Sequence, residues 1–415
     1  MPVTLVAHDR PTCRFAWNAL VGAVLAHPAA RGAAVEVART PDEVARRAAA
    51  ALVAGRIPVV GWSFYTASAR QVAGELAAVR AAVPDGRALH VAGGAHASGA
   101  PEATLRAGFD LAVVGEGEET LPRLLGAVAA GGDPRAVPGL SWLEGGALRT
   151  SGRAAPVDLD AYPPAAPGAG RIGPLEITRG CVWGCRFCQT PFLFKARFRH
   201  RSLGTIREVL RAQRAIRPMD LRFITPSALS WGSPDGGCDL AAIEALLATA
   251  REVAGPPAPG ARVLLGTFPS ELRPEHVSPR ALALLRRYCD NRTILVGGQS
   301  GSDRLLGVMG RGHDAGAVDR AVAIALEEGF HPSVDFVFGL PGETEEDRAA
   351  TRRQIDRLAR VGARIHVHAF DPLPGTPWRA EPRGVVDPAT AALLARLHAG
   401  GRAYGVSSSS RDPVS

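Results

Sequence analysis

The residues with the clearest chemical potential are three cysteines within a short stretch, Cys181, Cys185 and Cys188. Their spacing is C-x3-C-x2-C. Three thiolates at this spacing can hold three irons of a [4Fe–4S] cluster, which leaves the fourth iron without a protein ligand. An open coordination position is where a metal does chemistry rather than stabilising a fold. The spacing therefore predicts an iron–sulfur centre with one reactive corner.

Two other interpretations of the cysteines are a disulfide with a spare thiol and half of a zinc site. The sequence has no second C-x-x-C or C-x-x-H run that would complete a zinc tetrahedron. The other cysteines, Cys13, Cys238 and Cys289, are far apart, and each is typical of a small buried hydrophobic residue. Six cysteines in 415 residues do not make a disulfide framework, so we expect a reducing cytoplasm.

Composition favours a globular enzyme over a membrane protein. Hydrophobic residues make up 46% of the chain and charged residues 21%, which is ordinary for soluble proteins. No apolar run reaches the ~18 residues that span a bilayer, and the N-terminus lacks the pattern of a signal peptide. The net charge of +8 is compatible with anionic cofactors or substrates, and only weakly with nucleic acid.

The first 130 residues alternate between predicted strands and helices. Thr40-Pro41 followed by Glu43 is a helix start, and further helices are predicted over 15–25 and 69–83. Strands separated by helices predict a doubly wound parallel sheet, a Rossmann-like domain over 1–130. The Gly- and Pro-rich residues 131–174 predict a connector. The predicted strands are 3–7, 34–38, 57–62, 89–92 and 111–114.

From residue 175 the strand–helix alternation resumes. Six βα units predict a partial (β/α)6 TIM-like barrel over 175–380, followed by a helical extension at 381–406 and a disordered tail at 407–415. Reactive residues in such folds lie at the carboxyl ends of the strands. Small polar segments follow all six strands, which predicts a cradle for a polar cofactor beside the cysteines. The predicted strands are 175–178, 221–225, 262–267, 293–297, 333–338 and 365–369.

These strand ends resemble those of the radical S-adenosylmethionine (radical SAM) superfamily. The resemblance rests on the three cysteines with Phe187, and on segments 297–303, 309–313, 335–344 and 374–377. It implies a [4Fe–4S] cluster on the cysteines and SAM chelated to the open iron, where one-electron reduction gives a 5′-deoxyadenosyl radical. Strand two carries Thr225-Pro-Ser227 where the family often has Gly-Gly-Glu. The SAM-binding residues it implies are Phe187, Thr225, Ser227, Gln299 and Ser300.

The first domain is similar to the cobalamin-binding fold. Gly93-Gly94 would let a bulky ligand approach the backbone closely. The lower-ligand motif Asp-x-His-x-x-Gly is absent, because His8-Asp9-Arg10 lacks its spacing. The resemblance therefore implies cobalamin without a histidine on cobalt, and His96 is more typical of a polar surface residue. The cobalamin-binding residues it implies are Ser63, Tyr65, Gly93, Gly94, Gly115, Glu116 and Gly117.

Together, the two halves are similar to the family that joins a cobalamin-binding domain to a radical SAM domain. This implies an enzyme that methylates an unactivated carbon or phosphorus of a small-molecule or peptide substrate, with a flavodoxin or ferredoxin-type reductant. Radical cyclisation or rearrangement with the same cofactors is an alternative. A methylthiotransferase acting on tRNA or protein would need a second cluster, yet only Cys13 precedes residue 181. A cobalamin-binding sensor would leave the second domain without a role.

One basic stretch, 195–201, has two interpretations. It is either a solvated turn or a source of Arg197 or Arg199, which would neutralise a substrate carboxylate or phosphate or stabilise the reduced cluster.

Overall fold

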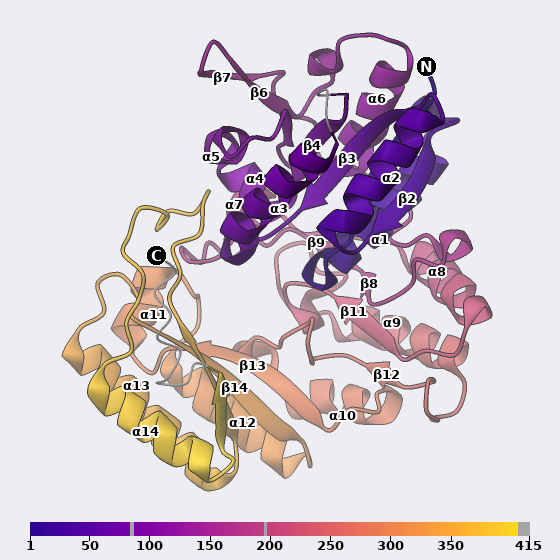
Figure 1. Cartoon of the computed structure of the whole chain (residues 1–415). Helices are drawn as coiled ribbons and strands as arrows, with labels where there is room; N and C mark the ends of the chain where they lie inside the picture. Colours follow the sequence, from indigo (N-terminus) through magenta and orange to yellow (C-terminus); the bar gives the residue numbers. More distant parts are fainter. Residues whose placement is uncertain (84–86, 195–196, 406–415) are drawn as a thin grey trace. The chain divides into compact units, whose positions relative to one another are not determined.

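The computed structural model describes residues 1–83, 87–194 and 197–405 (Figure 1). The chain divides into two compact units, Met1–Gly173 and Pro174–Pro372 with Thr376–Ser415, and the short segment Leu373–Gly375 groups with the first. The predicted tail at 407–415 and residues 195 and 196 of the basic stretch lie outside the described residues.

The first unit is built on one seven-stranded sheet in the order β2-β1-β3-β4-β5-β6-β7. Its first five strands are parallel, which confirms the predicted doubly wound sheet. The order β2-β1-β3-β4-β5 places the switch in direction between β1 and β3, the position where such sheets bind ligands. These strands are β1 (Val3–His8), β2 (Ala34–Ala38), β3 (Ile57–Ser63), β4 (Leu89–Gly93) and β5 (Leu111–Val113).

A β-hairpin follows within residues 131–174, where the sequence predicted only a connector. β6 (Leu140–Glu144) pairs antiparallel with β5 and with β7 (Ala147–Thr150). Gly145 and Gly146 join the two strands at φ values of 58° and 81°, which a two-residue hairpin turn requires. All of β7 is exposed, so it lacks the alternation of apolar and polar residues that would have predicted a strand.

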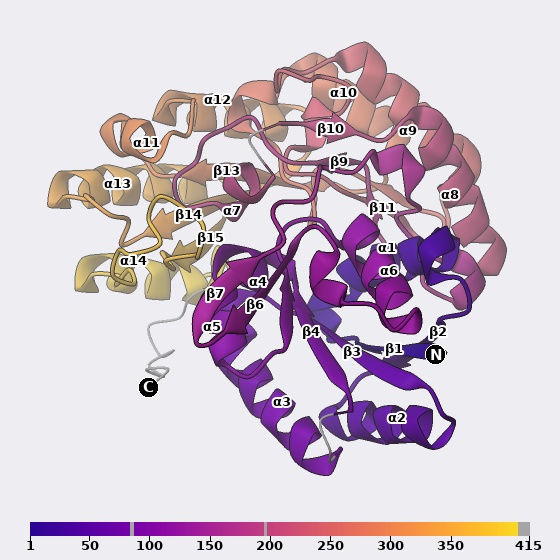
Figure 2. The same ribbon diagram turned by 90° about the horizontal axis from the view of Figure 1, so that it is seen from above.

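Helices cover both faces of this sheet (Figure 2). α1 (Arg14–Ala26) and α6 (Gly117–Ala129) pack on the face that carries Leu5, while α2 (Pro41–Val53) and α3 (Ala69–Ala82) pack on the face that carries Val6. Thr40 caps α2 by accepting a hydrogen bond from the Glu43 amide at 3.2 Å, as predicted. Because helices cover both faces of the sheet, a ligand can reach the strands at their carboxyl ends. Two short helices, α4 (Gly94–Gly99) and α5 (Pro101–Arg106), follow β4.

The second unit carries two parallel sheets, ordered β12-β11-β8 and β13-β14-β15-β16. Isolated parallel bridges continue the pairing from Thr225 to Ser270 and from Leu272 to Val296, which links the two sheets. The six predicted strands thus follow one another in order, as in the predicted partial barrel. They are β8 (Leu175–Glu176), β11 (Leu221–Ile224), β12 (Val263–Leu264), β13 (Thr293–Gln299), β14 (His331–Phe338) and β15 (Arg364–Ala369).

The C-terminal extension contains more than the predicted helix. α14 (Pro388–Ala399) is followed by β16 (Ala403–Gly405), which pairs parallel with β15. At three residues, β16 is too short for its periodicity to predict a strand.

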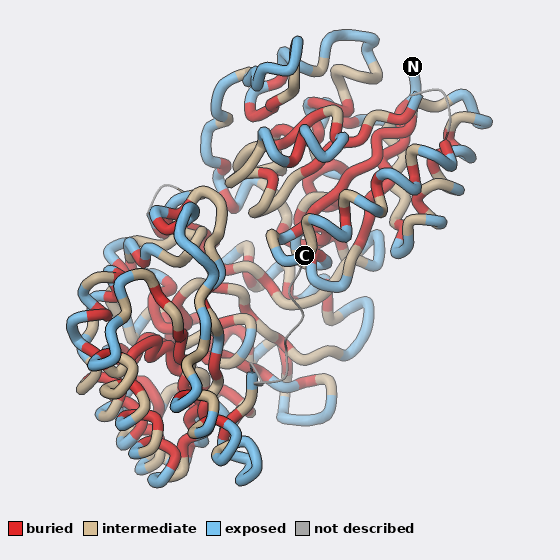
Figure 3. The backbone as a smooth tube through the Cα atoms, turned by 60° about the vertical axis from the view of Figure 1, so that its left-hand side comes forward, coloured by how far each residue is buried: buried red, intermediate tan, exposed pale blue. Residues whose placement is uncertain are grey.

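Outer helices bury the convex side of these sheets. The central strands of both units, among them β1, β3 and β14, are mostly buried (Figure 3). In the second unit, the core joins Leu175, Phe223, Val296, Phe336 and Val367 on the strands to apolar residues of the helices. None of the described helices has the length and apolarity needed to cross a membrane. The covering helices are α8 (Leu203–Ile216), α9 (Leu240–Ala254), α10 (Pro279–Tyr288), α12 (Ala315–Glu327) and α13 (Glu345–Val361).

Candidate active site in the barrel

The cysteine loop is closed at its base by two short antiparallel strands. β9 (Thr178–Arg179) leads into the loop and β10 (Arg199–His200) leads out of it. Gly180 has φ +83°, and a Cβ there would lie 1.8 Å from the Arg197 carbonyl oxygen, so this turn requires glycine. The Cys188 amide donates to the Cys185 carbonyl at 3.0 Å. The backbone thus fixes the loop that presents the thiols.

All three cysteines line one cavity of about 310 Å³. Phe187, Thr225 and Gln299, three of the predicted SAM-binding residues, line the same cavity. The structure therefore brings the cysteine loop together with the ends of β11 and β13, as expected for strand ends on one rim. Other residues in the lining are Trp183, Ser270, Glu271, Arg273, Arg311 and Asp335.

The donor set in this cavity fits an iron–sulfur cluster. Burial raises the pKa of Cys181 to about 11, and it also raises the pKa of Cys188. Such thiols lose their protons when a metal binds, so binding the cluster would exchange protons for iron. Three soft sulfur donors around one space match the three protein ligands of a [4Fe–4S] cluster with an open iron.

A buried arginine lies beside the cysteines. The Arg311 Nη1 is 3.8 Å from the Cys185 sulfur, and its Nη2 donates to the Gly297 carbonyl at 2.8 Å. Burial lowers the pKa of Arg311, but the negative charges of Glu271 and Cys185 outweigh this and hold it above its ordinary value. The site therefore contains a permanent cation that offsets the negative charge of thiolates and cluster.

Glycine makes room for this arginine. A Cβ on Gly297 would lie 2.3 Å from the Arg311 Nη2.

The second arginine, Arg273, stacks 3.7 Å above the Trp183 ring and donates to the Arg311 carbonyl. Sequence analysis missed the roles of both arginines. Segment 309–313 contributed to the family resemblance, but nothing in its sequence showed that Arg311 returns to the cysteine loop.

Gln299 ends β13 in a strained conformation. Its φ is 72°, a left-handed value that non-glycine residues seldom adopt, and the β13–β14 register shifts between Gly297 and Gln299. Strain of this kind is held at functional sites by the surrounding structure. Because Gln299 also lines the cavity, its predicted place at the site agrees with its geometry.

Two predicted SAM-binding residues lie outside the cavity lining. The Ser227 hydroxyl pairs with that of Ser230 at 2.8 Å, and the Ser300 hydroxyl pairs with that of Thr351 at 3.1 Å. Thr225 lines the cavity but donates its hydroxyl to the Ser227 carbonyl at 2.9 Å. These hydroxyls stabilise the loops at the strand ends. The sequence alone does not show which partners they bind.

In the first unit, the predicted cobalamin-binding residues follow three neighbouring strands. Ser63 ends β3, Gly93 ends β4 and Gly94 begins α4 with φ +89°. A Cβ on Gly94 would lie 3.0 Å from the Ser63 hydroxyl, whereas one on Gly115, after β5, would meet nothing within 4 Å. This edge combines exposed backbone with open space, which fits a large ligand. Tyr65, also predicted, is half exposed beside it.

Glu116 and Gly117, also predicted to bind cobalamin, contact neighbouring parts of the first unit, as do two of its histidines. The Glu116 carboxylate accepts a hydrogen bond from the Val157 amide at 2.9 Å, and a Cβ on Gly117 would lie 2.8 Å from Leu20. His8 is buried, with its ring centroid 4.6 Å from that of Trp62. His96 pairs with the Thr66 hydroxyl at 3.1 Å.

Fold and site together define a Rossmann-like domain followed by a partial barrel with a three-thiol cavity. Residues 175–355 match the radical SAM superfamily, and residues 20–125 match the B12 binding domain. The chain therefore contains a radical SAM domain that follows a B12 binding domain. The two matches confirm the predicted cofactors, a [4Fe–4S] cluster, SAM and cobalamin.

Individual relatives add detail. An uncharacterized protein of Methanopyrus kandleri is 28% identical over 68% of this chain and 61% of its own length. A tRNA-2-methylthio-N(6)-dimethylallyladenosine synthase of Chlorobium phaeovibrioides is 30% identical over 43% of this chain and 38% of its own length. The chain thus spans less than two thirds of these curated relatives.

A solved structure shares the fold of nearly the whole chain. It is the radical SAM methyltransferase TsrM from Kitasatospora setae, with cobalamin and a [4Fe–4S] cluster bound. The TM-score is 0.68 at 20% identity, and the match covers 92% of this chain and 74% of TsrM. The same enzyme has been solved with its tryptophan substrate and a SAM analogue. At this identity, the likeness is one of fold.

Proposed function

We propose that this protein is a cobalamin-dependent radical SAM methyltransferase that methylates an unactivated carbon or phosphorus. The observation that carries the proposal is the cavity in which three thiols meet a buried arginine, within a chain that also has a B12 binding domain. When bound, the cluster and SAM would supply a radical, and cobalamin would supply a methyl group. The residues described below would hold these groups and control their charge.

In the barrel, each residue type has a separate task. The three cysteines would hold the cluster, and Arg311, whose Nη1 is 3.8 Å from the Cys185 sulfur, would offset its negative charge. Thr225 and Gln299 line the same cavity, where a polar cofactor needs hydrogen-bonding partners. Phe187 adds an apolar wall that helps to exclude water.

In the first unit, the glycines at the carboxyl edge of the sheet would bind cobalamin through shape and backbone contacts. Gly94 and Gly115 both have positive φ and present main chain where a side chain would obstruct the ligand. The burial of His8 against Trp62 and the pairing of His96 with Thr66 favour binding without a histidine on cobalt.

We expect a small-molecule or peptide substrate, a flavodoxin or ferredoxin-type reductant, and a reducing, cytoplasmic setting. A cyclisation or rearrangement with the same cofactors is the second candidate, because the site described here would generate the radical in either case. A methylthiotransferase is less well supported. Cys13, the single cysteine before the barrel, is buried in the core of the first unit and offers no second cluster.

The test uses SAM that carries a trideuterated methyl group. The reconstituted protein should contain about four irons per chain, release 5′-deoxyadenosine under reduction, and pass the label to cobalamin, as measured by mass spectrometry. A sample without cobalamin is the matched control. Formation of 5′-deoxyadenosine with all of the label retained in methionine would favour rearrangement and contradict methyl transfer.

A further inference from the structure

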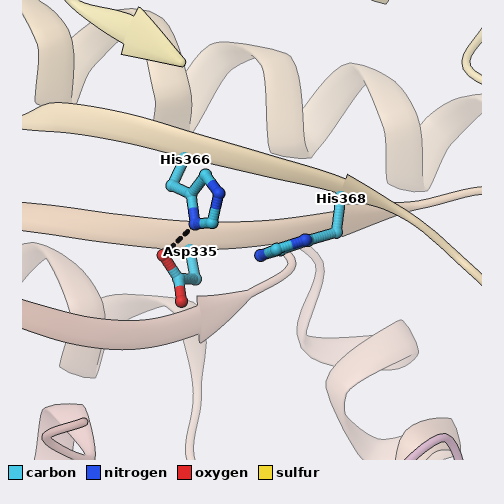
Figure 4. A group of neighbouring side chains, drawn as sticks. All are labelled: Asp335, His366 and His368. Carbon is cyan, nitrogen blue, oxygen red and sulfur yellow. Dashed lines mark hydrogen bonds and ion pairs between the residues drawn. The ribbon is translucent and has the colours of Figure 1, made fainter. Parts of the chain in front are cut away.

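Three metal-ligand side chains meet on the inner face of the barrel sheet. Asp335 on β14 and His366 on β15 are register partners, and His368 follows two residues later. Residues two apart on a strand project to the same side, so both histidines share the face that carries Asp335. The two imidazoles and the carboxylate lie on one side of the strands (Figure 4).

Distances within this group suit a single ion. One ligand atom from each residue lies within 4.8 Å of the others, and the Asp335 Oδ1 is 3.0 Å from the His366 Nδ1. Metal–ligand bonds of about 2.0–2.2 Å around a tetrahedral ion place two ligands roughly 3.3 Å apart. The closest pair already has this separation, and the widest needs to contract by at most about 1.5 Å, which side-chain rotation can supply.

Charge also favours a cation here. Burial raises the pKa of Asp335 to about 7, and the negative charge of Glu271 adds to this effect. His366 is half-buried and His368 is exposed, and an unprotonated nitrogen of either ring can donate a lone pair to a metal. Arg311 also faces Asp335, but it is engaged with Gly297 and Glu271. A divalent ion would stabilise the carboxylate that burial disfavours.

Tyr404 and Ser333 support the His366 ring. His366 stacks on Tyr404 of β16, with ring centroids 4.3 Å apart and planes inclined by 12°. The Tyr404 hydroxyl in turn pairs with the Ser333 hydroxyl at 2.8 Å. Partners that orient a ligand ring in this way are typical of metal sites. Ser333, Asp335, His366 and Tyr404 thus form one polar patch across three strands.

We propose that Asp335, His366 and His368 bind a divalent transition metal, and Zn²⁺ is the probe because two imidazoles and one carboxylate are a donor set of catalytic zinc sites. Three protein ligands leave a fourth position open. Asp335 also lines the cavity that contains the cysteines, so the open position lies at the edge of that cavity. There it would take an oxygen or nitrogen donor of the substrate. Metal binding itself does not depend on the proposed methyl transfer.

The experiment measures zinc in the full-length protein with its cluster reconstituted. After equilibration with micromolar Zn²⁺ and dialysis, elemental analysis should give about one zinc per chain beside about four irons. His366→Ala, His368→Ala and Asp335→Asn should each lose at least about tenfold in zinc affinity and keep the iron. His331→Ala is the matched control, since His331 is an exposed histidine at the start of β14.

Empty cluster cysteines can also bind zinc, so a variant with Cys181, Cys185 and Cys188 all replaced by alanine separates the two sites. It should lose its iron and keep its zinc. X-ray absorption at the zinc edge of the wild type should show nitrogen and oxygen near 2.0–2.1 Å and no sulfur near 2.3 Å. Absence of retained zinc, a sulfur shell, or zinc lost only with the cysteines would overturn the proposal. None of these results depends on measuring methyl transfer.

Discussion

The two units place their predicted cofactor residues at the carboxyl edge of a parallel sheet, but they use different means. In the barrel, side chains with strong chemistry converge on one cavity: thiols, two guanidinium groups and two carboxylates. In the first unit, the corresponding edge is mostly main chain and glycine, with φ values of 89° at Gly94 and 99° at Gly115. On the proposed function, the barrel site would determine reactivity, whereas the edge in the first unit would fit the shape of a cofactor that carries its own chemistry.

The sharpest test of this division is Cys185→Ala. It should reduce iron content and reductive SAM cleavage to background, because two thiols cannot hold the cluster with one open iron. Cobalamin binding, measured by absorbance after gel filtration, should be unchanged. Cys238→Ala is the matched control, since Cys238 belongs to the same unit and does not line the cavity. Joint loss of cobalamin and iron would show that the two sites are not separable.

The reciprocal test is Gly94→Val. Valine at φ +89° is strained by about 1–2 kcal/mol, and its Cβ would lie 3.0 Å from the Ser63 hydroxyl and 3.3 Å from the Phe64 carbonyl. We expect at least about a tenfold loss of cobalamin affinity, equivalent to about 1.4 kcal/mol, with normal iron content.

Gly74→Ala serves as the control for that variant. Gly74 lies on α3, and a Cβ there would meet nothing within 4 Å. Unchanged cobalamin binding in Gly94→Val would contradict a binding edge at Gly93–Gly94.

A third test concerns charge rather than shape. Arg311→Gln removes the buried cation beside Cys185, so adding an electron to the cluster becomes less favourable and its reduction potential becomes more negative. SAM cleavage should slow about 10–100-fold with four irons retained, and Arg311→Lys should recover part of the rate. Arg320→Gln, an exposed arginine on α12, is the control. An unchanged potential would show that Arg311 only supports packing.

The contrast between the units also explains what the sequence could predict. The cysteines form one local motif, and the glycines follow buried apolar strands, so spacing and pattern were enough to predict a site at each. The five parallel strands of the first unit were predicted almost to the residue, because each is a short apolar run between helices. Short apolar runs of this kind predict strands without any knowledge of the tertiary structure.

Contacts between distant strands could not be predicted in the same way. Arg311 approaches Cys185 across more than a hundred residues, and Asp335 meets His366 only through the β14–β15 register. The hydroxyls of Ser227 and Ser300 show the same limit, because their pairings with Ser230 and Thr351 also form only in the folded chain. Pairings of this kind depend on register and packing, which a single sequence does not contain.

The smallest effect we predict concerns how the barrel loops are supported. Asp347 forms a capping box with Thr344 at the start of α13 and also accepts hydrogen bonds from Ser302 and Arg304. Asp347 therefore connects α13 to the loop that follows β13. Gln299 is the last residue of β13 and directly precedes this loop. Asp347→Asn should cost about 1–2 kcal/mol of unfolding free energy, measured by chemical denaturation.

The pH dependence of this loss tests its cause. Burial alone would raise the pKa of Asp347, but the hydrogen bonds from Arg304, Ser302 and Thr344 outweigh it and hold the pKa below its ordinary value. A carboxyl whose pKa is lower in the folded state contributes fully above its unfolded pKa of about 4, and this contribution fades as the pH falls below that value. The unfolding free energies of wild type and Asp347→Asn should therefore converge in acid. Glu327 is an exposed carboxylate on α12, and Glu327→Gln, the control, should have the unfolding free energy of wild type at neutral pH. A stability difference that stays constant down to pH values well below 4 would assign the effect of Asp347 to packing rather than to its charge.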